Sequence, residues 1–309
     1  MTPKLAAVKK KLEAGVSLKQ PSGPPGNKKL TEEFLTGLKD SIETTPTTSI
    51  RKWAKIKKVA ASTMSTAVKR LGKASRVRPK RQLLTAKQKV KRVNRCKMIV
   101  NNLKSKPRST VRIFSDKKMF YVDQAYNRRN NRVIVDNDAE VTPVMTTKHP
   151  QGIMMLGVVA SDGKKMPPYF FPQGLKIGTE AYLKVLRTVV KPWIKANYPD
   201  GGYIFQQDNA PGHASNKTQA WLLKNLAGAW SKGYWPPSSP DLNPLDYSVW
   251  SVVEARACAT PHPNLDSLRL AICTELDNLS FAYLVKTCKS FRGRCEAVIE
   301  AEGGHIEGK

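Results

Sequence analysis

Acidic side chains in short polar blocks are the first candidates for chemistry in this sequence. Asp116 closes the β-rich run "VRIFSD", and Asp208 closes the run "YIFQQD" directly before "NAPGH". Two carboxylates held close together repel each other unless a cation lies between them, and hard oxygen ligands select Mg²⁺ or Mn²⁺. The pair predicts a divalent-metal site if the fold brings the two runs together.

A third ligand is expected from the segment 235–258, "WPPSSPDLNPLDYSVWSVVEARAC". Asp246 lies in the first turn of a predicted helix, and Glu254 lies two turns later, about 12 Å along the helix axis. Only one of these two can reach the same metals. Asp241, within Ser-Pro-Asp-Leu-Asn-Pro, has the surroundings of a turn residue whose side chain bonds to the backbone.

The elements that must position these carboxylates follow an α/β pattern from residue 110 onward. The expected strands are "TVRIFSD", "MFYVDQ", "NRVIVD", "GIMMLGVVASDG", "MPPYFFP" and "YIFQQD". A helix "TEAYLKVLRTVVKPWIKANY" precedes the last strand, and another begins near Asn216. Open α/β sheets bind ligands at the carboxyl ends of their strands. Asp116 and Asp208 are both expected at such ends, facing one edge of the sheet.

Positive charge is concentrated in the first third of the chain. The sequence carries a net charge of +29, and residues 1–110 hold 29 Lys or Arg but only 5 Asp or Glu. No acidic residue lies between Glu43 and Asp116. A surplus of this size indicates a polyanionic partner, whereas a solvated charged face usually mixes both signs.

This basic part is predicted to form a helix-turn-helix. The segments "LTEEFLTGLKDSIE", "TSIRKWAKIKK" and "VAASTMSTAVKRLG" each place apolar residues at helical spacing, and a tight turn precedes the third. A plain three-helix bundle is the alternative, and the charge favours DNA binding with the third helix in the major groove. The residues expected to contact DNA are Arg51, Lys52, Lys55, Thr63, Ser65, Thr66, Lys69, Arg70, Arg76, Arg78, Lys80 and Arg81.

Other features of the sequence indicate an intracellular protein. The five cysteines form no Cys-x-x-Cys pair, and no apolar run is long enough for a membrane span, so no membrane partner is expected. The run "RVRPKR" could follow a DNA groove or act as a nuclear import signal, and the nucleus is the expected location. His213 could orient a phosphate or make a structural hydrogen bond.

Three blocks of the sequence resemble the catalytic blocks of mariner-like transposases. These are "FSDKKMF", "QQDNAPGH" and "WPPSSPDLNPLDYSVW", in that order behind the basic helical arm. With 37 residues between Asp208 and Asp246, and Asp at the third position, the chain is most similar to the maT branch. The resemblance covers residues 30 to about 300.

The resemblance implies an RNase H-like catalytic domain in which Asp116, Asp208 and Asp246 form the metal-binding triad. It implies two Mg²⁺ or Mn²⁺ ions, double-stranded DNA with terminal inverted repeats as partner, a homodimer on DNA, and cut-and-paste transposition into a TA target. The expected domains are a lead-in and linker (1–29), a helix-turn-helix domain (30–84), a basic helical connector (85–109), the catalytic domain (110–300) and a flexible tail (301–309).

Two departures from the family pattern favour an alternative function. Lys117 follows the first aspartate where the family usually has Glu, and residues 1–29 resemble only the tail of a first helix-turn-helix unit and its linker. The alternative is therefore a catalytically inactive relic, N-terminally truncated, that binds DNA. A two-carboxylate glycosidase does not fit, because a neutral sugar gives the basic arm no role.

Overall fold

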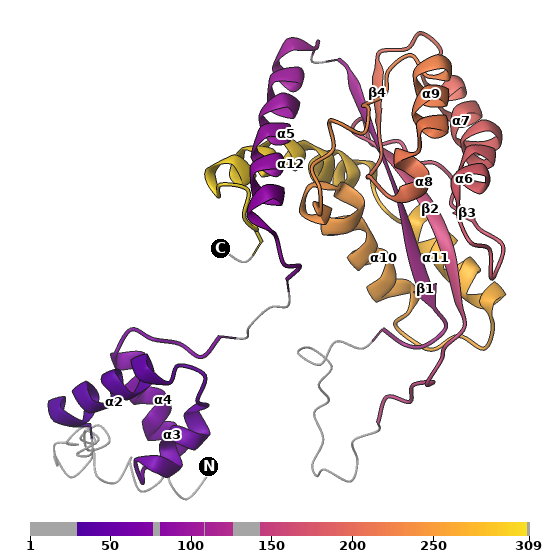
Figure 1. The fold of residues 1–309 in the computed structure, drawn as a ribbon. Coiled ribbons are helices and arrows are strands. Elements are labelled where there is room, and N and C mark those ends of the chain that lie inside the picture. Colours follow the sequence, from indigo (N-terminus) through magenta and orange to yellow (C-terminus); the bar gives the residue numbers. More distant parts are fainter. Residues whose placement is uncertain (1–29, 77–80, 108, 126–142, 308–309) are drawn as a thin grey trace, which may run out of the picture. The chain divides into compact units, whose positions relative to one another are not determined.

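The structure is a computed structural model that describes residues 30–76, 81–107, 109–125 and 143–307. The chain forms two compact units, Met1–Arg81 and Gln82–Lys309 (Figure 1). The predicted lead-in 1–29, Arg78, Lys80 and the predicted strand "NRVIVD" lie outside the described residues. No helix in the described ranges has both the length and the apolar character needed to cross a membrane.

Three helices lie within the described residues of the first unit. They are α2 (Glu32–Thr44), α3 (Ile50–Ile56) and α4 (Ala61–Arg70). The first two begin at hydroxyl caps: Thr31 accepts a hydrogen bond from the amide of Phe34, and Ser49 accepts one from the amide of Lys52, each at 3.2 Å. Such caps satisfy backbone donors that have no partner within the helix, so they set where each helix begins.

A small apolar core holds these helices together. Leu38, Trp53, Met64 and Val68 are among its buried residues. A short turn, residues 57–60, joins α3 to α4, and Gly72 ends the last helix with φ +67°, a conformation that favours glycine. The predicted three-helix unit with a tight turn before its last helix is confirmed.

A four-stranded sheet forms the centre of the second unit. Its strands are β1 (Val111–Tyr121), β2 (Gly152–Ala160), β3 (Tyr169–Phe170) and β4 (Tyr203–Gln206), in the order β3-β2-β1-β4. The pairs β1–β2 and β2–β3 are antiparallel, and β1–β4 is parallel. A single parallel bridge between Phe205 and Ala229 extends the sheet beyond β4.

Helices cover both faces of this sheet (Figure 1). One group of helices begins with a continuous run of α6 (Thr179–Val185), a π-helical turn (Leu186–Val190) and α7 (Lys191–Asn197). The same group includes α8 (Pro211–Ala214) and α9 (Asn216–Asn225). The remaining helices are α5 (Ala86–Ser105), α10 (Trp250–Ala257), α11 (Leu265–Asp277) and α12 (Phe281–Glu300). Two apolar cores result, one shared with α6, α7 and α9 and the other with α5, α10, α11 and α12. The predicted α/β plan is confirmed.

The first strand differs from the prediction. The runs "TVRIFSD" and "MFYVDQ" were expected as two strands, but residues 111–121 form one strand of 11 residues. Asp116 therefore lies in the middle of β1 and not at its carboxyl end. The polar centre stays extended because its side chains have partners: the Ser115 hydroxyl donates to the Gln206 carbonyl at 3.0 Å, and Lys118 pairs with Glu254 at 2.9 Å.

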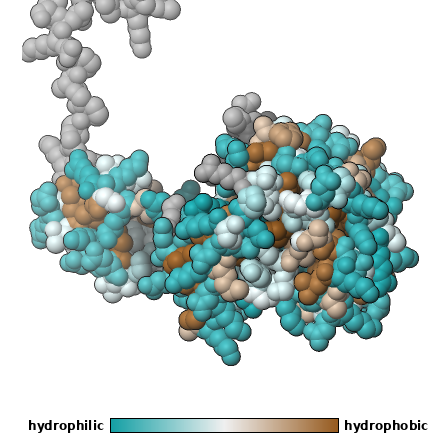
Figure 2. Space-filling view, turned by 90° about the horizontal axis from the view of Figure 1, so that it is seen from above, coloured by the Kyte–Doolittle hydropathy of each residue, from teal (hydrophilic) through white to brown (hydrophobic). Residues whose placement is uncertain are grey.

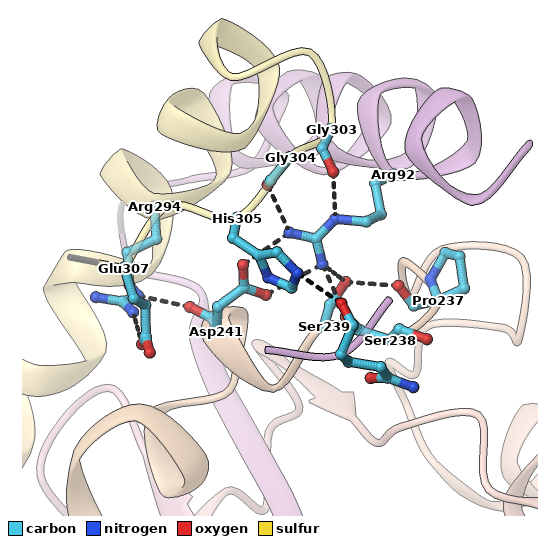
Figure 3. A network of polar contacts seen from close by, with 11 residues as sticks. Arg92, Pro237, Ser238, Ser239, Asp241, Arg294, Gly303, Gly304, His305 and Glu307 are labelled. Atoms are coloured by element: carbon cyan, nitrogen blue, oxygen red, sulfur yellow. Dashed lines mark hydrogen bonds and ion pairs between the residues drawn. The ribbon is translucent and has the colours of Figure 1, made fainter. Parts of the chain in front are cut away.

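The Pro-rich segment before Asp246 is held by a buried arginine of α5 (Figure 3). The Arg92 side chain is fully buried, and its two terminal nitrogens donate to the Asp241 carboxylate at 3.1 and 2.7 Å. The same guanidinium donates to the carbonyl of Ser238 at 3.0 Å. The Asp241 side chain was expected to bond to backbone, but it binds a guanidinium instead.

The same arginine also binds the end of the chain (Figure 3). Arg92 donates to the carbonyls of Gly303 at 2.9 Å and Gly304 at 3.3 Å, and the His305 ring bonds to the Gln82 carbonyl at 2.8 Å. The expected flexible tail, 301–309, is therefore packed against α5 over its described part. Helix α5, expected as a separate connector, belongs to the second unit.

Candidate active site

Asp116 and Asp208 approach each other because of the register of two parallel strands. Phe114 pairs with Gln206, the last residue of β4, so the next residues of both strands continue side by side. Asp116 and Asp208 each follow this pair by two positions. Ile204 of β4 and Phe114 both belong to the apolar core of the α10 side, which shows that this face of the sheet carries Asp116.

Trp250 holds the carboxylate of Asp116. Its indole Nε1 donates to Asp116 Oδ2 at 2.7 Å. The ring reaches this position because the residue opposite Asp116 on β2 is Gly157, where a Cβ atom would lie 2.4 Å from the Trp250 ring. Burial raises the pKa of Asp116 to about 6; the hydrogen bond from Trp250 opposes the rise and the charge of Asp208 adds to it.

His213 and a backbone amide hold the carboxylate of Asp208. His213 Nδ1 lies 2.5 Å from Asp208 Oδ1, and the amide of Ala210 donates to the same oxygen at 3.0 Å. Burial alone would raise the pKa of Asp208, but the His213 hydrogen bond and the nearby Lys117 charge hold it below its ordinary value. Burial lowers the pKa of His213, so the imidazole is neutral at pH 7 and the contact is a hydrogen bond to an anion.

Asp246 comes to these carboxylates from a π-helical turn, Leu245–Val249, that runs directly into α10. Burial raises the pKa of Asp246 to about 8, and the charges of Asp116 and Asp208 and a hydrogen bond with Asp116 add to the rise. More than a third of Asp246 is open to solvent, so water screens part of this effect. A hydrogen bond between two carboxyl groups requires a proton on one of them, so Asp116 and Asp246 titrate as a pair.

The two competitors for the third position have other partners. Glu254 forms an ion pair with Lys118 at 2.9 Å, and Asp241 is bound by Arg92. Neither contributes to the pKa of Asp116 or Asp208. Asp246 therefore fits the third position better than either of them.

The donor set has the chemistry of a divalent-metal site. Three carboxylates offer hard oxygen ligands. Burial raises the pKa of Asp116 and Asp246, and the charges of the neighbouring carboxylates add to the rise. In the present arrangement, no three Asp, Glu, His or Cys side chains of the described ranges lie close enough together to hold one ion.

Lys117 lies beside the cluster on the opposite face of β1. Its ammonium group is 5.7 Å from the centre of the Tyr182 ring, and burial lowers its pKa while the charges of Asp208 and Asp116 oppose this shift. The lysine thus supplies a positive charge next to the carboxylates.

Sequence reasoning missed two contributors to this site and left the role of a third open. Trp250 and Gly157 have no signature of their own, although Trp250 lies four residues after Asp246 and thus near the same helix face. His213 was left open between a phosphate contact and a structural hydrogen bond; the structure shows a hydrogen bond to Asp208 itself.

Most of the predicted DNA contacts are on the surface of the first unit. The exposed ones are Arg51, Lys52, Lys55, Thr66, Lys69, Arg70, Arg76 and Arg81, and Thr63 and Ser65 are half-buried. The hydroxyl of Thr66 donates to the Ser62 carbonyl at 3.1 Å within α4. Hydrophilic side chains cover most of the visible surface of the molecule, with scattered apolar areas (Figure 2).

Comparison with known proteins finds transposases among the proteins similar to this chain. No protein-family model matches the chain. The chain is 30% identical over 122 residues to the Tc1 transposase of Caenorhabditis elegans, which is 40% of this chain and 43% of that protein. It is 27% identical over 229 residues to the Tc3 transposase of the same organism, covering 72% of this chain and 64% of that protein.

Solved structures show the same fold. The Mos1 transposase paired-end complex with a left transposon end superposes with a TM-score of 0.75 and 16% identity over 99% of this chain and 89% of that chain. The Mos1 transposase catalytic domain superposes with a TM-score of 0.56, and 74% of this chain covers all of that domain.

The chain is related to the Tc1/mariner transposases. Its second unit has the RNase H-like fold of the Mos1 catalytic domain, as predicted. The matches to Tc1 and Tc3 span 43% and 64% of the lengths of these relatives. The family resemblance inferred from the three blocks is thus confirmed, while the maT branch stays a prediction.

Proposed function

We propose that this Tc1/mariner relative is a metal-dependent DNA transposase, which cuts and joins phosphodiester bonds with Asp116, Asp208 and Asp246. The observation that carries the proposal is the electrostatic coupling of these three carboxylates on an RNase H-like sheet. The basic helical unit supports the same function, because a cluster of anions cannot approach a DNA phosphate without positive charge elsewhere in the protein.

The reaction fits two successive in-line displacements at phosphorus. In the first, a water oxygen bonds to the phosphorus at the transposon end, and the ester bond to the 3′ oxygen breaks to release a 3′-hydroxyl. In the second, that hydroxyl attacks a target phosphodiester and displaces the target 3′ oxygen. Two Mg²⁺ or Mn²⁺ ions supply Lewis acidity when bound at such a site. Asp116, Asp208 and Asp246 would hold them, and the lowered pKa of Asp208 keeps that carboxylate anionic at neutral pH.

The finer assignments rest on the relatives. The Mos1 structures include paired-end and strand-transfer complexes and were obtained with Mn or Mg. For this chain we propose binding to the terminal inverted repeats of its own element, a homodimer on DNA, a TA target and action in the nucleus. The exposed arginines and lysines of α3 and α4 are the proposed DNA contacts.

A cleavage assay tests the function. Duplexes carrying the inverted repeats that flank the coding sequence are incubated with the protein and Mg²⁺ or Mn²⁺, and the nicked strand is mapped. We expect cuts at the transposon end that disappear in EDTA and in Asp208→Asn. Binding to these duplexes without any cutting by the wild-type protein would favour the inactive DNA-binding relic.

A further inference from the structure

Two of the three site carboxylates are held in the same way. One oxygen of each accepts a hydrogen bond from a ring N–H: Asp208 Oδ1 from His213 at 2.5 Å, and Asp116 Oδ2 from Trp250 at 2.7 Å. Both rings are buried, with 1% and 2% of the residue exposed. Neither donor is an obligatory cation, so each fixes an oxygen without neutralising the carboxylate as an ammonium group does.

The hydrogen-bond inventory fixes which His213 nitrogen carries the proton. An anionic carboxylate can only accept, so the Nδ1 atom beside Asp208 must be the donor. His213 Nε2 is buried and has no partner among the described residues. The imidazole therefore has one polar contact, and that contact is with the carboxylate.

Neighbouring groups fix the His213 ring in place. The Tyr182 ring lies against it, tilted by 30° with centroids 4.0 Å apart, and the Tyr182 hydroxyl donates to the Gln207 side chain at 2.7 Å. The Gln207 amide in turn donates to the His213 carbonyl at 3.0 Å. Trp250 is fixed by its packing over Gly157. Such support is typical of groups that orient metal ligands.

We propose that His213 and Trp250 are positioning residues of the metal site, each holding one oxygen of its aspartate so that the other oxygen faces the metal. This inference rests on the proposed function. It goes further by assigning the orientation of two site carboxylates to two ring N–H donors that do not touch the metal. Loss of partners of this kind typically weakens metal binding about 10- to 100-fold.

Two variants of the same shape separate positioning from packing. His213→Asn places an amide N–H where the imidazole Nδ1 stood, and His213→Leu has nearly the same outline without a donor. Both leave a similar gap beside Tyr182, so both lose similar thermal stability. Mn²⁺ binding to the DNA-free protein is measured by electron paramagnetic resonance, and thermal unfolding is measured in EDTA.

We expect Mn²⁺ affinity to fall about tenfold or more in His213→Leu and to recover most of that loss in His213→Asn. Trp250→Phe keeps the aromatic packing and removes the N–H, and we expect it to weaken Mn²⁺ binding as well. Equal Mn²⁺ affinities in the Asn and Leu variants would overturn the inference for His213. Wild-type affinity in Trp250→Phe would overturn it for Trp250.

The assay also separates this inference from the proposed function. The Mn²⁺ assay uses no DNA, so its result does not depend on cleavage. If the wild-type protein binds Mn²⁺ but cuts no transposon end, the transposase function is rejected, and the variants alone decide whether the positioning roles hold. Wild-type protein that binds no Mn²⁺ would overturn the metal site and the positioning roles with it.

Discussion

The raised pKa values of Asp116 and Asp246 have a consequence for stability. Their folded-state pKa values, about 6 and about 8, lie above the ordinary carboxyl value near 4. Between pH 4 and 8 the folded protein therefore binds more protons than the unfolded chain. The pair stabilises the fold fully below pH 4, and this contribution is lost as the pH rises through 6 and 8.

We expect the free energy of unfolding in EDTA to contain a component that falls from pH 5 to pH 8, and Asp246→Asn to remove most of it. Denaturant unfolding of both proteins at the two pH values measures the difference. At pH 8 the variant should be the more stable protein. A variant that is less stable than wild type at pH 8 would contradict this interpretation.

Lys117 competes with metal for the same negative charges. Its ammonium group interacts with Asp208 and Asp116, so a cation that enters the cluster meets a like charge. We expect Lys117→Met to raise Mg²⁺ affinity roughly three- to tenfold, since one charge interaction at partly buried sites is about 1 kcal/mol. Titration calorimetry measures the affinity, and the exposed Lys224→Met on α9 is the control. Weaker Mg²⁺ binding in Lys117→Met would show that the lysine supports the site.

At the scale of elements, the approach of β2 to α10 depends on a residue without a side chain. A Cβ atom at position 157 would lie 2.4 Å from the Trp250 ring, which is packed in the core and has little room to move. We expect Gly157→Ala to destabilise the protein by about 1–3 kcal/mol and to break the hydrogen bond to Asp116. Denaturant unfolding and tryptophan fluorescence measure the two effects.

A matched glycine provides the control for this substitution. Gly293 lies within α12, and a Cβ atom there would meet nothing within 4 Å. Gly293→Ala should stabilise the protein by up to about 1 kcal/mol, because alanine favours helix more than glycine does. Equal effects at both positions would mean that the close contact with Trp250 does not matter.

The buried ion pair between Arg92 of α5 and Asp241 predicts a larger loss of stability. Asp241→Asn removes the charge partner of a guanidinium that is fully buried, and an uncompensated buried charge costs about 3–5 kcal/mol. Arg92→Met combined with Asp241→Leu should recover part of this loss because neither residue is then charged. Denaturant unfolding of the two variants gives the comparison, and a double variant no more stable than Asp241→Asn would contradict it.

The sequence predicts some of these elements and not others for physical reasons. Local signals, such as caps at Thr31 and Ser49 and a helix-ending Gly72, lie within a few residues of the helix ends that they define. The single strand 111–121 could not be predicted, because its polar centre is stable only through partners such as Glu254, 136 residues away. The burial of Arg92 depends on equally distant partners.

The same reasoning applies to the candidate site. Its three aspartates were chosen as candidates because they stand in polar blocks with distinct surroundings, and their role stays a prediction. The sequence did not reveal Trp250, and it left the role of His213 open, because an indole or imidazole N–H next to an aspartate follows from tertiary packing. Glu254 could be set aside only after its ion pair with Lys118 was seen.

At the scale of the whole molecule, the distribution of charge predicts how DNA binding responds to salt. Most of the net charge lies before residue 111, and the exposed Lys69 and Arg70 close the last helix of the first unit. Each phosphate contact adds about 0.9 to the slope of log affinity against log salt. We expect Lys69→Gln with Arg70→Gln to lower that slope by up to about 2.

Fluorescence anisotropy with a transposon-end duplex measures this slope. The salt concentration is varied from about 50 to about 200 mM, the range over which phosphate contacts change affinity most visibly. Asp208→Asn is the control and should leave the slope unchanged, because it lies outside the basic unit. An unchanged slope in the double variant would exclude this end of α4 from the phosphate contacts.

The position of Arg92 in the chain also determines when the second unit can form during synthesis. Its carbonyl partner at Gly303 lies 211 residues later. At a translation rate of about 5–20 residues per second, α5 leaves the ribosome roughly 10–40 s before that partner is made. Its charge partner Asp241 follows Arg92 by 149 residues, so the guanidinium gains its partners in two steps. The part of the second unit around Arg92 can therefore close only after both Asp241 and Gly303 have left the ribosome.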